Sequence, residues 1–158
     1  MTTGSVLALA FAIGLVAGLR SLTAPAIVSW AAHLKWLDLQ NSFLAFLGST
    51  AAVYILAVCA IGELVVDKLP NAPSRTEPLG LLARFATGGL SGAALCAAAN
   101  KSVVVGAVLG AVGGVIGGFV GYELRTRLVL ALSLPAIVVA LAEDAIAIGG
   151  GFFIVSRF

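Results

Sequence analysis

The chain has very few charged side chains for its length. Only 10% of its 158 residues are Asp, Glu, Lys or Arg, whereas 61% are hydrophobic and the mean hydropathy is +1.13. A soluble domain of this size has too little interior to hide so much apolar surface. The shortage of charge therefore argues against a soluble protein. The net charge of only +2, without a basic patch that includes aromatic residues, argues against nucleic-acid binding.

Residues that bind metals or act as nucleophiles are also scarce. The two cysteines, Cys59 and Cys96, lie inside apolar runs, where they are expected to pack as small hydrophobic side chains rather than form a disulfide or a metal site. The single histidine, His33, lies between Trp30 and Trp36, a grouping typical of a membrane surface. No Ser-His-Asp order or HExxH motif is present, so the sequence predicts neither an enzyme nor a cofactor.

Long uncharged stretches fill most of the chain and predict an all-α, polytopic transmembrane helical bundle in a single domain, residues 1–158. Division at the polar segments gives six candidate spans, at residues 5–20, 22–34, 42–66, 80–99, 102–122 and 128–156. The second span has about 13 residues, fewer than the ~17 to 25 that usually cross a bilayer. It therefore either crosses the membrane as a broken helix or enters and returns as a re-entrant half-helix.

The distribution of Lys and Arg favours six crossings. With six crossings, six basic residues fall on one side, namely Arg20, Lys68, Arg75, Arg84, Arg125 and Arg127. Three fall on the other side, namely Lys35, Lys101 and Arg157. A re-entrant second segment changes this ratio to five to four. Because positive charge is enriched in cytoplasmic loops, six crossings place both termini outside the cytoplasm and the polar loop near 67–78 inside it.

The sequence contains a weak internal repeat. Residues 22–28 resemble residues 132–138, and each segment follows a Gly…Leu-Arg element, at 18–20 and at 121–125. If the repeat is real, Glu63 and Glu143 are its corresponding acids. Small transporters are often built from such duplicated halves, but the abundance of Ala, Leu and Val leaves chance similarity open as well.

The first candidate site is the pair Glu63 and Asp67, which are four residues apart and share one face of a helix. Their carboxylates repel each other unless a cation or a proton lies between them. The candidate cations are a transported ion and the side chains of Lys68, Arg20 and Arg84. The polar loop that follows adds three candidate residues, Asn71, Ser74 and Arg75. Either this segment binds a ligand, or its ion pairs only fix two helix ends.

The second candidate site is the pair Glu143 and Asp144, about 15 residues into the apolar segment 128–156. At ~1.5 Å per residue this depth is near the bilayer midplane, where an acid is costly and points to function. Alternatively, the helix ends here and the glycines at 149–151 begin a separate element. One of the two acids is expected to face a partner such as Arg20 or Arg84, while the other lines a polar cavity. Arg20 lies in a sequence that favours a helix break, and it is expected to bind an anion or to pair with Glu63 or Asp67. Arg84 has the same two possibilities, with structural pairing favoured.

Glycines recur every three to four residues in the fifth span and predict a face that allows close helix packing. The packing partner is either another helix of the same chain or a second copy. The glycines through which we expect a homodimer are Gly106, Gly110, Gly114, Gly117 and Gly121.

Three charged motifs resemble a known family. They are Gly-Leu-Arg-Ser-Leu-Thr-Ala-Pro at 18–25, the segment that contains Glu63, Asp67, Lys68 and Pro70, and Leu-Ala-Glu-Asp at 141–144. This pattern resembles a family of small bacterial integral membrane proteins that are described only as a domain of unknown function. The resemblance spans nearly the whole chain and implies a multi-pass protein of the bacterial inner membrane. It implies no substrate, reaction or cofactor.

The leading hypothesis is a homodimeric membrane transporter or channel for an ion or small solute. Its acids would respond to protons or cations, and Arg20 would be their counter-ion or an anion ligand. The alternative is a structural or accessory membrane protein whose ion pairs only lock the helices. A third possibility is a membrane-embedded enzyme that acts on lipid, which requires Asp67, Ser74 or Arg75 to meet in one open pocket.

Overall fold

The computed structural model describes residues 1–68, 77–132 and 135–158. Over these residues the chain forms six α-helices, one short 3-10 helix and no strand. In chain order they are α1 (Thr3–Leu19), α2 (Thr23–His33), η1 (Phe43–Gly48), α3 (Thr50–Val66), α4 (Pro78–Ala98), α5 (Val103–Leu132) and α6 (Ala136–Val155). The predicted all-α class is confirmed.

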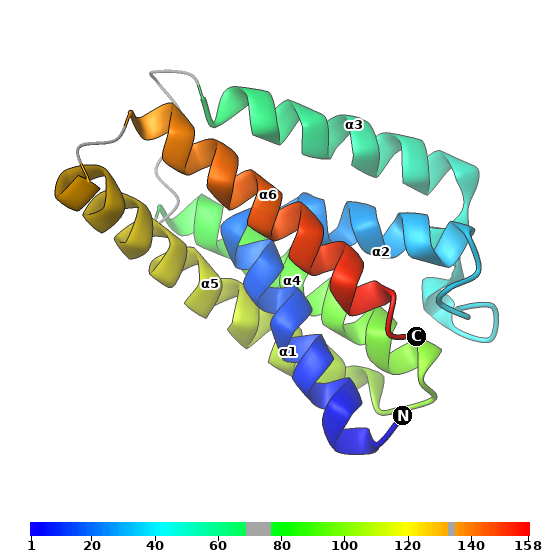
Figure 1. The fold of residues 1–158 in the computed structure, drawn as a ribbon. Helices are drawn as coiled ribbons and strands as arrows, with labels where there is room; N and C mark the ends of the chain where they lie inside the picture. The colour runs from blue at the N-terminus through cyan, green and yellow to red at the C-terminus, as the bar shows by residue number, and fades with distance from the viewer. Residues whose placement is uncertain (69–76, 133–134) are drawn as a thin grey trace.

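Successive helices run in opposite directions and form an up-and-down bundle (Figure 1). The N-terminus, the C-terminus and the η1 segment lie at one end, which we call the terminal end (Figure 1). The C-terminal ends of α1, α3 and α5 point to the opposite end, which we call the loop end. Because α2 leads from α1 toward the terminal end, where α3 begins, residues 22–34 do not turn back to the side on which they start (Figure 1).

Glycines bring α1, α4 and α5 into close contact. A Cβ atom added at Gly110 of α5 would collide with the carbonyl oxygen of Gly88 in α4, and one added at Gly14 of α1 would collide with the carbonyl of Gly110. Gly106 meets Gly92 of α4 in the same way. The three helices therefore form a tightly packed group in which backbone lies against backbone.

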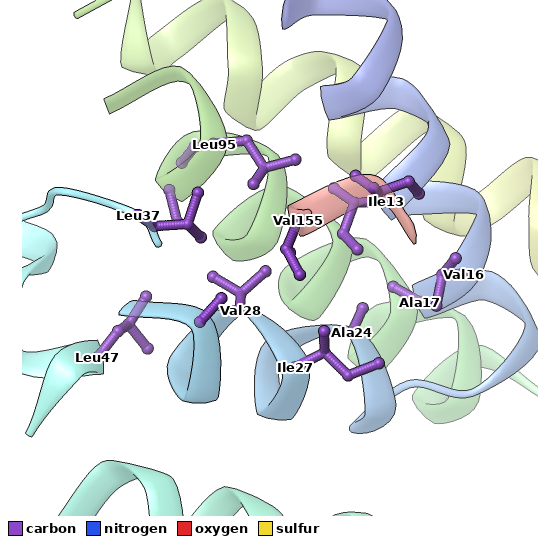
Figure 2. Packing of buried hydrophobic residues seen from close by; sticks show 14 of the residues in the cluster. Ile13, Val16, Ala17, Ala24, Ile27, Val28, Leu37, Leu47, Leu95 and Val155 are labelled. Atoms are coloured by element: carbon purple, nitrogen blue, oxygen red, sulfur yellow. The ribbon is translucent and has the colours of Figure 1, made fainter. Parts of the chain in front are cut away.

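The hydrophobic core fills the space between α1, α2, α4 and α6 toward the terminal end (Figure 2). Ile13 of α1, Val28 of α2 and Leu95 of α4 are completely buried there, together with Val155 of α6. Leu37, which follows α2, closes the same cluster.

The helix α3 lies at the edge of the bundle, where it packs mainly on α2 and η1 (Figure 1). Only Val53 and Ala60 of its 17 residues are buried, whereas Tyr54, Ile55 and Val58 are exposed. An exposed apolar face of this kind is suited to contact with lipid.

Three helices, α4, α5 and α6, are long and apolar enough to cross a membrane, and α1 and α3 are shorter apolar helices. These lengths support a multi-pass membrane protein.

Two predicted boundaries are wrong. The span expected at 42–66 is divided into η1 and α3. The fifth and sixth spans do not separate near 122–128, because α5 continues through its charged residues, where Arg127 Nε donates to Glu123 Oε1 over 2.8 Å one helical turn away. The sixth helix also continues without a break from Ala136 through Gly149 to Val155, so the glycines start no separate element.

Candidate functional site: a buried charge cluster

The turn between α1 and α2 exposes backbone N–H groups that a carboxylate from another helix binds. The first helix ends at Leu19 and the second begins at Thr23 without a side-chain cap. Glu63 of α3 supplies the missing cap. Its Oε1 accepts hydrogen bonds from Ser21 N at 2.8 Å and Ser21 Oγ at 2.7 Å, and its Oε2 accepts one from Leu22 N at 2.8 Å. The positive N-terminal end of α2 stabilises this negative charge.

Arg20 is the centre of the cluster and is completely buried. Its Nη1 donates to Asp67 at the end of α3, and its Nη2 lies 2.5 Å from Asp144 Oδ1 in α6. Lys68 Nζ lies 2.7 Å from Asp144 Oδ2 and also donates to the carbonyl oxygen of Leu64 at 2.8 Å. Three helices that lie far apart in the sequence are therefore joined by ion pairs. From the sequence, Arg20 is a candidate partner of Glu63 or Asp67 and also of one of the two acids Glu143 and Asp144. The structure pairs it with Asp67 and Asp144.

Several polar atoms of this site have incomplete hydrogen bonding. Arg20 Nη2 and Asp144 Oδ1 are close enough for an ion pair, but they are not aligned for a hydrogen bond. Within the described part of the chain, Arg20 Nε and Thr23 Oγ1 are buried without a hydrogen-bond partner. A buried ion pair offsets its desolvation only when its geometry and hydrogen bonds are good. Measured by its contribution to stability alone, this cluster therefore holds the helices together less well than apolar side chains of the same volume would.

Arg84 connects α4 to the same region. It is buried, and its Nε donates to the carbonyl oxygen of Gly18, near the end of α1, at 2.9 Å. Its Nη1 donates to Gly80 O at 2.8 Å. Gly118 of α5 lies against its side chain, where an added Cβ would come within 3.0 Å of Arg84 Cδ. The hydrogen bond to Gly18 O joins α4 to the C-terminal end of α1.

The cluster lies midway along the long helices. Asp144 is the ninth of the 20 residues of α6, and Glu143, also buried, precedes it. Gly117 and Gly118, which face Gly18 and Arg84, are the fifteenth and sixteenth of the 30 residues of α5. If α5 crosses the hydrocarbon core of about 30 Å, its middle is near the bilayer midplane. With that placement the charges would lie deep in the membrane, and the midplane depth of Glu143 and Asp144 stays a prediction.

The side chains of the charge cluster differ in their exposure to solvent. The side chain of Arg20 is 0% exposed, whereas those of Asp67 and Lys68 are 18% and 24% exposed. Ile13, Val16 and Ile27, labelled in Figure 2, belong to the buried apolar core. Among the described residues of the cluster, those at the end of α3 are therefore more accessible than Arg20.

Residues 7–156 match the family described as Domain of unknown function (DUF4126). The chain belongs to this family. The resemblance carried by the charged motifs is thus confirmed, and it covers nearly the whole DUF4126 chain. No curated protein and no solved structure matches the chain.

The glycine face of the DUF4126 chain is occupied within one chain. Gly106, Gly110 and Gly114 lie against α4, and Gly117 lies against α1. Gly121 is buried as well. All five glycines expected at a homodimer contact are therefore already buried in the single chain, so a dimer has to use another surface.

The remaining candidates cannot be placed in this site. Asn71, Ser74 and Arg75 lie outside the described residues. Among the described residues of the DUF4126 chain, no group of three or more His, Cys, Asp or Glu side chains is arranged to hold a metal ion. The sequence analysis also missed Ser21, whose only signal was its position directly after Arg20 in a helix break.

Proposed function

We propose that this protein is a small membrane transporter or channel for an ion or small solute. The observation that carries the proposal is the completely buried Arg20 held between Asp67 and Asp144, which come from two different helices. Burying such charges in a bilayer is costly, and apolar side chains of similar volume would hold the helices together at lower cost. Charges in such a position are typical of ion and substrate pathways.

In this proposal, the acids respond to a proton or a cation, and Arg20 is their counter-ion. A change in charge at Asp67 or Asp144 weakens the contacts that hold the C-terminal end of α3 to the bundle. Because α3 has few other buried contacts, its end is the part of the cluster best suited to move. A pathway that opens there would connect the cluster to the loop end.

The proposed membrane placement has six crossings in the bacterial inner membrane, with the loop end in the cytoplasm. The orientation is taken from the distribution of Lys and Arg that the sequence predicts for six crossings. Among the described basic residues outside the buried region, Arg125 and Arg127 belong to the second half of α5, and Lys35, Lys101 and Arg157 lie at the terminal end. The internal repeat and the homodimer stay part of the proposal. The surface best suited to a dimer is an apolar groove between α4 and α5, which includes Gly89 and Ala111.

The test is ion flux in proteoliposomes that contain a pH-sensitive dye, with a potassium gradient and valinomycin to set the membrane potential. We expect proton or cation flux with the wild-type protein and none above empty liposomes with Asp144→Asn. The control is Glu123→Gln, which removes an exposed carboxylate paired with Arg127 one turn away, and it should transport as wild type does. Equal flux in wild type and Asp144→Asn would sink the proposal.

The accessory or structural reading is the second candidate, because each of the described acids at the cluster has partners. It predicts that Asp144→Asn melts at a lower temperature, by an amount that corresponds to about 3–5 kcal/mol, without a change in any flux. The enzyme reading has the least support, since Asp67 is engaged by Arg20 and the other two residues it requires are outside the described part of the chain.

A further inference from the structure

The last turn of α2 and the segment that links α2 to α3 carry a group of exposed aromatic side chains at the terminal end. Trp30, Trp36, Phe43 and Phe46 are 42%, 45%, 76% and 55% exposed. Four leucines of the linking segment are buried and pack it against the bundle, namely Leu37, Leu39, Leu44 and Leu47. On either side of it the chain continues into apolar helices. Exposed Trp at the end of membrane helices is typical of the level of the lipid headgroups.

A pocket of ≈ 460 Å³ lies in the same segment. Its wall includes His33, Lys35, Asp38, Gln40 and Ser49. His33 Nδ1 lies 3.0 Å from Gly48 O, and Asp38 Oδ1 accepts a hydrogen bond from Gln40 N at 3.1 Å, so both side chains are held at the wall. Neither Lys35 nor Asp38 forms an ion pair in the described part of the chain. The pocket thus presents a positive and a negative group that are both unpaired.

The backbone of Lys35 is in an unusual conformation. Its φ is 61°, in the left-handed region that favours glycine or asparagine, at the position directly after the C-cap of α2. The matching position after α4 is Asn100, with φ 53°, an ordinary residue for this conformation. A lysine at such a position costs stability relative to glycine. A strained residue of this kind in a pocket suggests that its side chain has a role.

From these observations we propose that the pocket binds the headgroup of a phospholipid that carries both a phosphate and an amine, such as phosphatidylethanolamine. Lys35 meets the phosphate and Asp38 meets the amine, while Phe43 and Phe46 lie beside the acyl chains. The occupant is a lipid rather than a soluble metabolite because the exposed aromatic residues place the pocket at the level of the headgroups. This site is separate from the charge cluster and does not depend on transport.

The first test measures thermal unfolding of the full chain in detergent with added phosphatidylethanolamine, phosphatidylglycerol or no lipid. We expect phosphatidylethanolamine at about ten times its Kd to raise the Tm by roughly 4 °C, and phosphatidylglycerol, which lacks the amine, to raise it less. In Lys35→Gly this rise should be lost, although the lipid-free Tm should not fall because glycine adopts the left-handed conformation without strain. Asp38→Asn should respond equally to both lipids.

The matched control is Asn100→Gly, which changes the same kind of backbone position after α4 and removes no charge. It should keep the full response to phosphatidylethanolamine. A full response in Lys35→Gly, or an equal response of the wild-type protein to both lipids, would overturn the proposal.

The second test uses the tryptophan fluorescence of wild-type protein in vesicles of phosphatidylethanolamine with brominated acyl chains. Trp30 and Trp36 are the only tryptophans of the chain. Bromine near the headgroup should quench them more strongly than bromine near the end of the acyl chain. The reverse order would show that the segment is not at the interface and would also reject the headgroup site.

Discussion

At the scale of single residues, the charged side chains of this protein have two distinct tasks. Glu63 binds the backbone N–H groups of the turn between α1 and α2, whereas Asp67, one turn later, binds the side chain of Arg20. The sequence places these two acids on one helical face and indicates that a positive group lies nearby. It cannot tell which acid receives the arginine, because that depends on where the turn at Ser21 lies in space.

The capping role of Glu63 leads to a prediction about stability. Glu63→Gln keeps one acceptor oxygen but removes the negative charge at the N-terminal end of α2, so we expect a loss of about 1–3 kcal/mol in the free energy of unfolding. Thermal unfolding in detergent measures this loss. Glu123→Gln, at an exposed ion pair, should stay within about 0.5 kcal/mol of wild type. Equal melting of both variants would contradict the capping role.

At the scale of helices, the glycines of α5 decide how closely the inner helices approach. Their spacing in the sequence correctly predicts a packing face. The spacing alone does not identify the partner, because α1, α4 and a second copy of the chain would all fit such a face equally well. The structure assigns the face to α1 and α4, which meet it at Gly14, Gly88 and Gly92.

A pair of glycine substitutions tests this packing. Gly110→Ala places a methyl group against the backbone of Gly88, which cannot move away easily, so we expect a loss of about 1–3 kcal/mol. Gly149→Ala in α6 is the control, because nothing lies within 4 Å of an added Cβ there. It should stabilise the helix by roughly 0.5–1 kcal/mol. If Gly110→Ala unfolds at the same temperature as Gly149→Ala, the close contact of α4 and α5 is wrong.

The helix boundaries near the end of α5 show why sequence reasoning failed locally. The charged residues Glu123, Arg125 and Arg127 look like the end of a membrane span. They lie instead on a helix that continues for five more residues after Arg127. A helix with favourable pairs one turn apart does not have to end where its apolar stretch ends.

At the scale of the whole molecule, composition predicts the membrane class and the charged motifs predict the family. Composition does not predict how the helices are arranged in the bundle. The contact between Lys68 and Asp144 joins residues 76 positions apart, and no periodicity of the sequence indicates it. Lys68 follows the end of α3 and Asp144 belongs to α6, and Asp144 and Lys68's neighbour Asp67 both pair with Arg20 in the turn after α1.

The central claim is that the charges of the cluster serve a function that apolar packing does not supply. The most direct measurement is ion flux through proteoliposomes that contain the triple variant Arg20→Met, Asp67→Leu and Asp144→Leu, together with its Tm. Lys68 keeps its hydrogen bond to Leu64 O in this variant. Because a buried ion triad can be replaced by apolar side chains without loss of stability, we predict a folded protein with a Tm near that of wild type and no flux. A folded triple variant that still transports as wild type does would contradict the claim.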